Sequence, residues 1–160
     1  MVMGFSLIAK DFFEYGVGAL RDKVVAVFLL AATPLHAQDV TVLAFGDSLT
    51  QGYGLPEAQG LVPQLEGWLT ANGVEVELIN GGVSGDTTAG GAARAAWSLT
   101  PDVDAMIVTL GGNDLLRGID PSVARSNLRQ ILETARSRDV EVLLVGMRAP
   151  GNYGADYKRA

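Results

Sequence analysis

The chain has 160 residues, of which 48% are hydrophobic and 19% are charged, and its net charge is −6. This length and composition predict one domain with a sizeable core and exclude an intrinsically disordered chain. The acidic balance argues against nucleic acid as a partner, and the absence of cysteine excludes disulfides, thiolate catalysis and cysteine-based zinc sites.

Residues 1–37 are predicted to be an N-terminal extension that ends in an export signal. Two basic residues precede a short apolar run over residues 24–35, and small Ala37 follows at a plausible cleavage point. Leu35, at the −3 position from the cleavage point, is larger than the usual alanine. The run is too short to span a bilayer comfortably, and the alternative is an ordinary buried helix or an uncleaved anchor. We expect a periplasmic or secreted protein; a mature chain that retains Met1 in mass spectrometry would contradict this.

The folded domain is predicted over residues 38–160, where short apolar runs alternate with longer amphipathic ones. The apolar runs are rich in β-branched residues and predict four strands, over residues 40–45, 74–80, 105–111 and 140–147. The amphipathic runs predict helices within residues 61–73, 87–99 and 121–135. Good capping residues stand at the helix ends, namely Gly73, Asp86 or Thr87, and Asp120 with Pro121.

Strands that alternate with helices predict parallel βαβ units and a three-layer α/β fold. In the strand over residues 74–80, acids alternate with apolar residues, which indicates an edge strand exposed on one face. Trp68 and Trp97 lie in predicted helices, and we expect both to be core residues. Ligands of such sheets bind outside the carboxyl ends of the strands, so the residues after each strand are candidates for a site.

Glycines and small polar residues follow three of the four predicted strands. Residues 46–48 read GDS, residues 80–87 read NGGVSGDT, and residues 111–114 read GGND. Each segment by itself suits an ordinary turn, in which glycine supplies positive φ and an aspartate or asparagine caps the chain. Their common place at one edge of the sheet favours a functional site.

Acyl-transfer chemistry suits this set of residues. It needs a nucleophile on a sharp turn and several hydrogen-bond donors where an oxyanion develops. Ser48 offers the hydroxyl and a backbone N–H. Gly85 offers a backbone N–H that no side chain shields, and Asn113 offers a neutral side-chain amide.

Other site motifs fail on this sequence. A nucleophile elbow requires G-x-S-x-G, and Thr50 occupies the place of its last glycine. No lysine follows Gly52 as a phosphate-binding loop requires, and a dinucleotide fingerprint would need glycine at Asn80. The chain has one histidine, so it has no histidine and acid cluster with the spacing of metal ligands.

The blocks FGDSLTQGYG, NGGVSGDTTAGG and VTLGGNDLLRG, in this order, resemble those of the GDSL or SGNH hydrolase family. From about Val40 onward the chain is most similar to the exported thioesterase, arylesterase and lysophospholipase branch. The resemblance implies a flavodoxin-like sheet, no metal or organic cofactor, and a small acyl ester, acyl thioester or lysophospholipid as substrate. It also implies that Ser48 is the nucleophile and that Gly85 and Asn113 complete the oxyanion hole.

Other polar residues near these blocks have more ordinary interpretations. Asp47 and Tyr153 are candidate substrate-binding residues, although Asp47 suits a turn better than a catalytic acid. Asp86 and Asp114 suit capping or loop-organising positions. His36 belongs to the predicted export signal, too far upstream of the folded part to be the base.

No base for Ser48 is found in the folded part of the sequence. In this family the base and its aspartate come from a later D-x-x-H block, and no D-x-x-H occurs between Val40 and Ala160. We expect the last strand and helix of the family fold to be missing as well. We therefore expect a C-terminally truncated domain that keeps the nucleophile and oxyanion hole, lacks the base and orienting acid, and is nearly inactive and less stable by itself.

Two other functions compete with an esterase. A non-catalytic domain that binds acyl chains or glycans on the same scaffold is the main alternative, because a fold alone does not imply chemistry. A nucleotide-binding module of flavodoxin type is the less well supported alternative, since the sequence does not match the phosphate-binding fingerprints.

Overall fold

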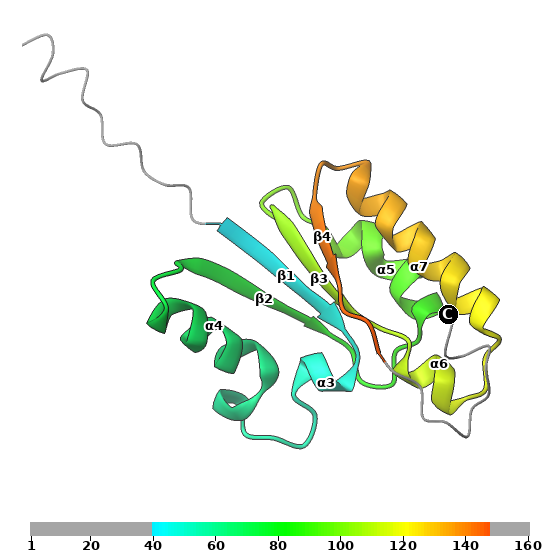
Figure 1. Ribbon diagram of the computed structural model, residues 1–160, viewed down its shortest axis with the longest axis horizontal. Helices are drawn as coiled ribbons and strands as arrows, with labels where there is room; N and C mark the ends of the chain where they lie inside the picture. Colours follow the sequence, from blue (N-terminus) through cyan, green and yellow to red (C-terminus); the bar gives the residue numbers. More distant parts are fainter. Residues whose placement is uncertain (1–39, 148–160) are drawn as a thin grey trace, which may run out of the picture. The chain divides into compact units, whose positions relative to one another are not determined.

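The computed structural model describes residues 40–147, and these form a parallel sheet with helices on both faces (Figure 1). The predicted export signal, His36 and Tyr153 lie outside the described residues. The α/β class with a parallel sheet is confirmed. Within residues 40–147, no helix is long and apolar enough to cross a membrane.

The sheet contains four strands in the order β2-β1-β3-β4, and every neighbouring pair is parallel. This is the order of the first four strands of a flavodoxin-like sheet. The predicted edge position of β2 is therefore confirmed. The strand bounds are β1 (Val40–Gly46), β2 (Val76–Gly82), β3 (Ala105–Thr109) and β4 (Glu141–Leu144).

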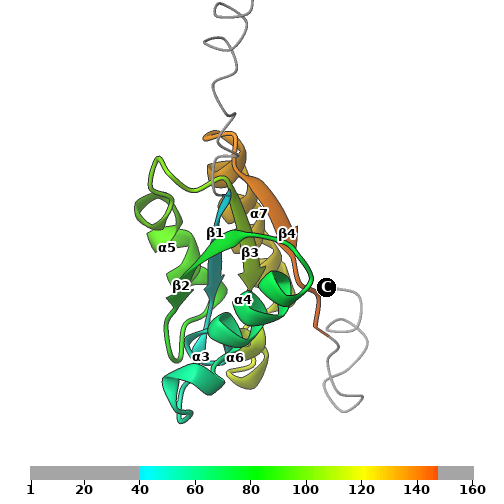
Figure 2. The ribbon, with the colours of Figure 1, turned by 90° about the vertical axis from the view of Figure 1, so that its left-hand side faces the viewer.

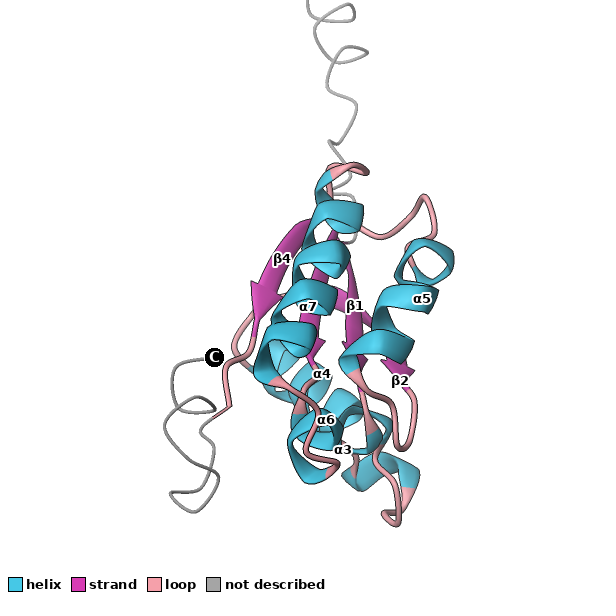
Figure 3. Ribbon diagram, turned by 90° about the vertical axis from the view of Figure 1, so that its right-hand side faces the viewer, coloured by secondary structure: helices cyan, strands magenta, loops and turns pink. Residues whose placement is uncertain are grey.

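Three longer helices cover the two faces of the sheet. Figure 2 shows α4 in front of one face, and Figure 3 shows α5 and α7 side by side on the other. Their bounds are α4 (Leu61–Ala71), α5 (Thr88–Ser98) and α7 (Pro121–Arg136). The structure also has three shorter elements that the sequence did not predict, because one or two turns give no readable periodicity. These are α3 (Ser48–Gln51), the 3₁₀ turn η1 (Glu57–Gln59) and α6 (Gly112–Leu116).

The predicted helix ends agree with the structure. Thr87 is the N-cap of α5, where its side chain accepts a hydrogen bond from Gly90 N. Asp120 is the N-cap of α7, with Pro121 directly after it. Hydrogen bonds from the side chain and the backbone N–H of Ser122 hold the pKa of Asp120 below its usual value. Local capping chemistry thus sets where these helices begin.

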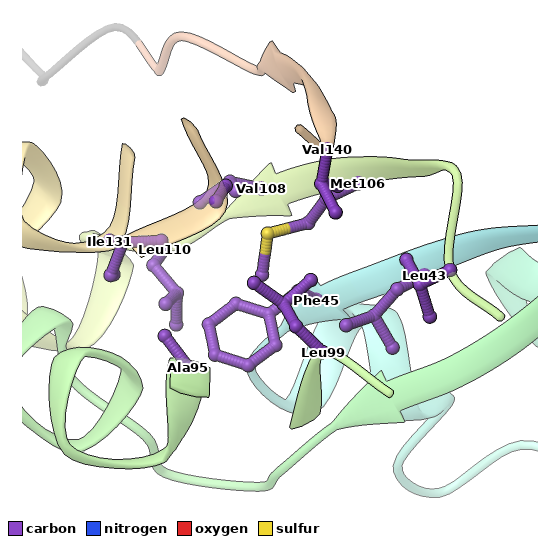
Figure 4. Close-up of a cluster of buried hydrophobic side chains, with 11 residues drawn as sticks. Leu43, Phe45, Ala95, Leu99, Met106, Val108, Leu110, Ile131 and Val140 are labelled. Atoms are coloured by element: carbon purple, nitrogen blue, oxygen red, sulfur yellow. The ribbon is translucent and has the colours of Figure 1, made fainter. Parts of the chain in front are cut away.

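The larger core lies under α5 and α7. Phe45 of β1 is fully buried there beside Met106 and Val108 of β3 and Ile131 of α7 (Figure 4). A smaller core forms under α4, where Ala44 packs with Val62 and Leu78. Ala44 and Phe45 serve opposite faces because successive side chains of a strand alternate.

The expectation that Trp68 and Trp97 are core residues is wrong. Their exposed fractions are 62% and 82%. In α4 the face toward the sheet is centred on Val62, Leu65 and Leu69. This stripe leaves Trp68 at its margin, because each residue turns the helix by about 100°.

In α5, small residues face the sheet instead of Trp97. A Cβ at Gly91 would lie 2.4 Å from Leu110 Cδ1 and 3.3 Å from Phe45 Cε1, so the backbone of α5 packs closely against these side chains. Ala95 is fully buried on the same face. So close an approach leaves no room for an indole, and Trp97 points away.

Candidate active site

The carboxyl ends of three strands meet at one edge of the sheet. In the registers of the parallel pairs, Gly46 of β1 lies opposite both Gly82 of β2 and Thr109 of β3. The segments that follow these residues are therefore neighbours. Figure 3 shows α3 and α6 together at the end of the sheet to which the strand arrows point.

Ser48 is the first residue of α3, directly after the turn that ends β1. Asp47 is the N-cap, and its Oδ1 accepts a hydrogen bond from Leu49 N at 3.0 Å. Ser48 is half-buried and, in the first turn, its backbone N–H has no intrahelical acceptor. Thr50 holds the turn against β3, since it is fully buried and its hydroxyl lies 2.9 Å from that of Thr109.

The end of β2 lies directly against α3. A Cβ at Gly82 would fall 2.2 Å from Gln51 N and 2.6 Å from Gln51 Cα, so any side chain here would displace the helix that carries Ser48. Asn80 Oδ1 accepts a hydrogen bond from Gly82 N at 3.0 Å. This role of Gly82 was missed in the sequence, where its only signal is a second glycine in a row.

Gly85 lies in the loop between β2 and α5. Its φ is 76°, a left-handed conformation that favours glycine. The Gly85 carbonyl accepts a hydrogen bond from Arg117 Nη2 at 2.8 Å. Arg117 directly follows α6, and the sequence analysis did not single it out.

Asn113 joins the segments that carry Ser48 and Gly85. Its Nδ2 donates to the Asp86 carbonyl at 2.9 Å and lies 3.3 Å from Asp47 Oδ2. The structure thus brings the three predicted residues into one cluster, through the neighbours Asp47 and Asp86. The contact with Asp47 is the longer of the two.

Asp114 fixes α6 against the start of α5. It is 1% exposed, and its carboxylate accepts hydrogen bonds from Thr88 N at 2.8 Å and from the Thr88 hydroxyl at 2.6 Å. Asn127 of α7 donates to the same hydroxyl at 3.0 Å. A buried carboxylate is tolerated when its oxygens are satisfied in this way. The loop-organising role predicted for Asp114 is confirmed.

Asp86 also organises its loop, as predicted. Its Oδ2 forms an ion pair of 2.8 Å with Arg94 Nε, and its Oδ1 accepts from Thr87 N at 3.1 Å. The carboxylate of Asp47 is held in a similar way, since Asp47 is 6% exposed and both of its carboxylate oxygens have hydrogen-bond partners. Asn113 is thus held by the carboxylate of Asp47 and by the backbone carbonyl of Asp86.

The cluster combines the Ser48 hydroxyl with backbone N–H groups and the Asn113 amide, and residues 40–147 add no imidazole to it. None of residues 40–147 is a histidine. Such an arrangement can stabilise a negative oxygen beside a serine, which is the requirement of acyl transfer. Residues 40–147 therefore offer no imidazole that could accept the proton of the Ser48 hydroxyl.

Known proteins resemble this chain in sequence and in fold. The chain is 40% identical to esterase TesA of Pseudomonas aeruginosa over 121 residues, which is 75% of this chain and 60% of the relative. It is 37% identical to thioesterase 1/protease 1/lysophospholipase L1 of Escherichia coli K12, over 84% of this chain and 64% of the relative. The chain therefore spans less than two thirds of the length of these curated relatives.

A solved structure has the same fold. The crystal structure of AlinE4, an SGNH-hydrolase family esterase, matches with a TM-score of 0.72 and 50% sequence identity, over 76% of this chain and 66% of that one. Residues 44–160 match the GDSL-like Lipase/Acylhydrolase family, and this range contains all three blocks at the strand ends. The chain therefore belongs to the GDSL-like lipase and acylhydrolase family.

Proposed function

We propose that the domain hydrolyses carboxylic esters or thioesters, with small acyl esters, acyl thioesters or lysophospholipids as substrates, through an acyl-enzyme on Ser48. The observation that supports this most strongly is the place of Asn113. Its amide is held between Asp86, next to Gly85, and Asp47, next to Ser48. Membership of a family of lipases and acylhydrolases supports the same chemistry.

In this mechanism Ser48 Oγ attacks the acyl carbonyl carbon. The carbonyl oxygen becomes an oxyanion, which accepts hydrogen bonds from Ser48 N–H, Gly85 N–H and the Asn113 amide. The serine proton passes to a base and from there to the alcohol or thiol leaving group, whose bond to the carbonyl carbon breaks and leaves the acyl group on Ser48. Water releases the acyl group in a second step. Asp47 acts as a positioning residue, because its carboxylate is buried and bound to Leu49 N and Asn113.

We propose in addition that the protein acts outside the cytoplasm. The support is the basic and apolar pattern of residues 1–37. The same residues precede the domain that we assign to the hydrolase, which begins at residue 38.

A serine-directed fluorophosphonate tests the role of Ser48. Its phosphorus accepts Ser48 Oγ, the phosphorus–fluorine bond breaks, and the serine proton passes to a base. Because residues 40–147 contain no histidine, imidazole is added to the buffer as that base. We expect the 160-residue chain to be phosphonylated at Ser48 at a rate that rises with imidazole concentration, as mass spectrometry of the digested chain can measure.

The Ser48→Ala variant is the matched control, and it should take up no label at the peptide that contains residue 48. Uptake by another serine in both proteins would reject Ser48 as the nucleophile. A chain that binds a fatty acid or a glycan but is never labelled, whatever the imidazole concentration, would favour the non-catalytic binding domain.

A further inference from the structure

Arg94 of α5 contacts segments that carry the candidate site, and its side chain is only 17% exposed. Its Nε contacts Asp86 Oδ2 at 2.8 Å, its Nη1 donates to the Gly81 carbonyl and its Nη2 donates to the Gly46 carbonyl, both at 3.0 Å. The guanidinium carbon also lies 3.8 Å from the centre of the Phe45 ring. One side chain therefore contacts the ends of β1 and β2 and the loop before α5.

The charge of Arg94 is paired, and an apolar side chain in its place would leave the carboxylate of Asp86, which is only 10% exposed, without its partner. Pairing of charge is common to arginine and lysine, so what sets Arg94 apart is the geometry of its donors. The planar guanidinium has its donors in a fixed fork, so it sets the separation between its acceptors. Those three acceptors belong to segments that are 8, 13 and 48 residues away in the sequence.

Each acceptor of Arg94 is close in the chain to a candidate site residue. Gly46 precedes Ser48 by two residues, and Asp86 directly follows Gly85. The Asp86 carbonyl in turn accepts the 2.9 Å hydrogen bond from Asn113 Nδ2. The position of Asp86 thus affects both side-chain and backbone donors of the candidate oxyanion hole.

We propose that Arg94, through Asp86, is a positioning residue for the oxyanion hole; this rests on the function proposed above. Arg94 touches no substrate. It fixes the Asp86 side chain and the two strand ends, so that Gly85 N–H and the Asn113 amide converge on one point beside Ser48. A displacement of about 1 Å at such a site can cost about 100-fold in rate.

The test compares the parent chain with Arg94→Lys in the imidazole-assisted phosphonylation of Ser48. Lysine keeps a positive charge near Asp86, but its single nitrogen on a flexible stem cannot hold three acceptors in a fixed geometry. We expect the maximal labelling rate to fall about 10- to 100-fold, while the half-saturating probe concentration stays within about twofold. Both proteins are assayed at a temperature at which circular dichroism shows them fully folded.

Arg138→Ala is the matched control. Arg138 also donates to a backbone carbonyl, that of Leu99, but Leu99 precedes β3 and so lies at the opposite end of the sheet. This variant should label at the parent rate. An equal fall in the labelling rate of both variants would show that the loss in Arg94→Lys reflects general stability, and it would overturn the proposal.

Arg94→Ala gives an independent readout, because added guanidinium ion can occupy the space of the missing side chain. At millimolar guanidinium chloride, well below denaturing concentrations, we expect labelling of Arg94→Ala to recover, whereas labelling of Asn113→Ala should not. If Arg94→Lys fails to fold, this rescue decides the question, and its absence counts against the proposal.

The outcomes separate this inference from the proposed function. If Ser48 of the parent chain is labelled but Arg94→Lys labels equally fast, the inference is overturned and the proposed function stands. If Ser48 of the parent is never labelled, the proposed function fails, and the role of Arg94 in an oxyanion hole fails with it.

Discussion

Without added imidazole, the 160-residue chain should hydrolyse p-nitrophenyl acetate about 10⁶-fold more slowly than a serine hydrolase with a complete triad. A serine hydroxyl is a poor nucleophile until a base takes its proton, and that base is normally an oriented histidine. The chain has one histidine, His36, and residues 40–147 contain none. The remaining rate should be about 10³- to 10⁴-fold above the reaction in water, from binding and the oxyanion hole.

The measurement is the release of p-nitrophenolate by the chain and by Ser48→Ala side by side, each with and without imidazole. The difference between the two proteins is the part of the rate that passes through Ser48. This difference should be small in plain buffer and should grow with imidazole concentration. Turnover near about 10 s⁻¹ in plain buffer, lost in Ser48→Ala, would show that the chain itself supplies a base.

The Asn113→Ala variant should lower the imidazole-assisted rate of Ser48 phosphonylation by about 10²- to 10³-fold. A phosphonyl oxygen develops negative charge as the serine attacks, as an acyl oxyanion does. The hydrogen bond to the Asp86 carbonyl holds the Asn113 amide in place, and the N–H that faces Asp47 Oδ2 at 3.3 Å is the one that would donate to that oxygen. Donors fixed in advance stabilise a transition state more than mobile ones do.

Asn72→Ala is the control for the loss of an asparagine amide. Asn72 is exposed at the end of α4, where its Nδ2 donates to the Trp68 carbonyl at 2.7 Å. Its removal should leave the labelling rate unchanged. Thermal unfolding of both variants checks the fold, since a lost hydrogen bond costs about 1 kcal/mol of stability. A rate within twofold of the parent for folded Asn113→Ala would remove Asn113 from the mechanism.

The sequence alone determined the order of the strands and the three long helices, and it predicted at which edge of the sheet the candidate site residues lie. Strands and long helices have local periods, so their apolar patterns are readable residue by residue. Caps act within one turn, so Asp120 was predicted directly and Thr87 was one of two candidates. Parallel strands bring their carboxyl ends to one edge of the sheet. A pattern that predicts the strands therefore also predicts that Ser48, Gly85 and Asn113, which follow three of them, lie near one another.

The tertiary structure decided which faces are buried and which groups meet. Trp68 and Trp97 lie outside the core because α4 and α5 present other residues to the sheet. In α4 the rotation of the helix decides this, and in α5 the close approach of its backbone at Gly91 does. The contacts of Asn113 with Asp47 and of Arg94 with Gly46 join residues 66 and 48 positions apart. No local pattern encodes such pairs, because they depend on where separate strands and helices come to rest against each other.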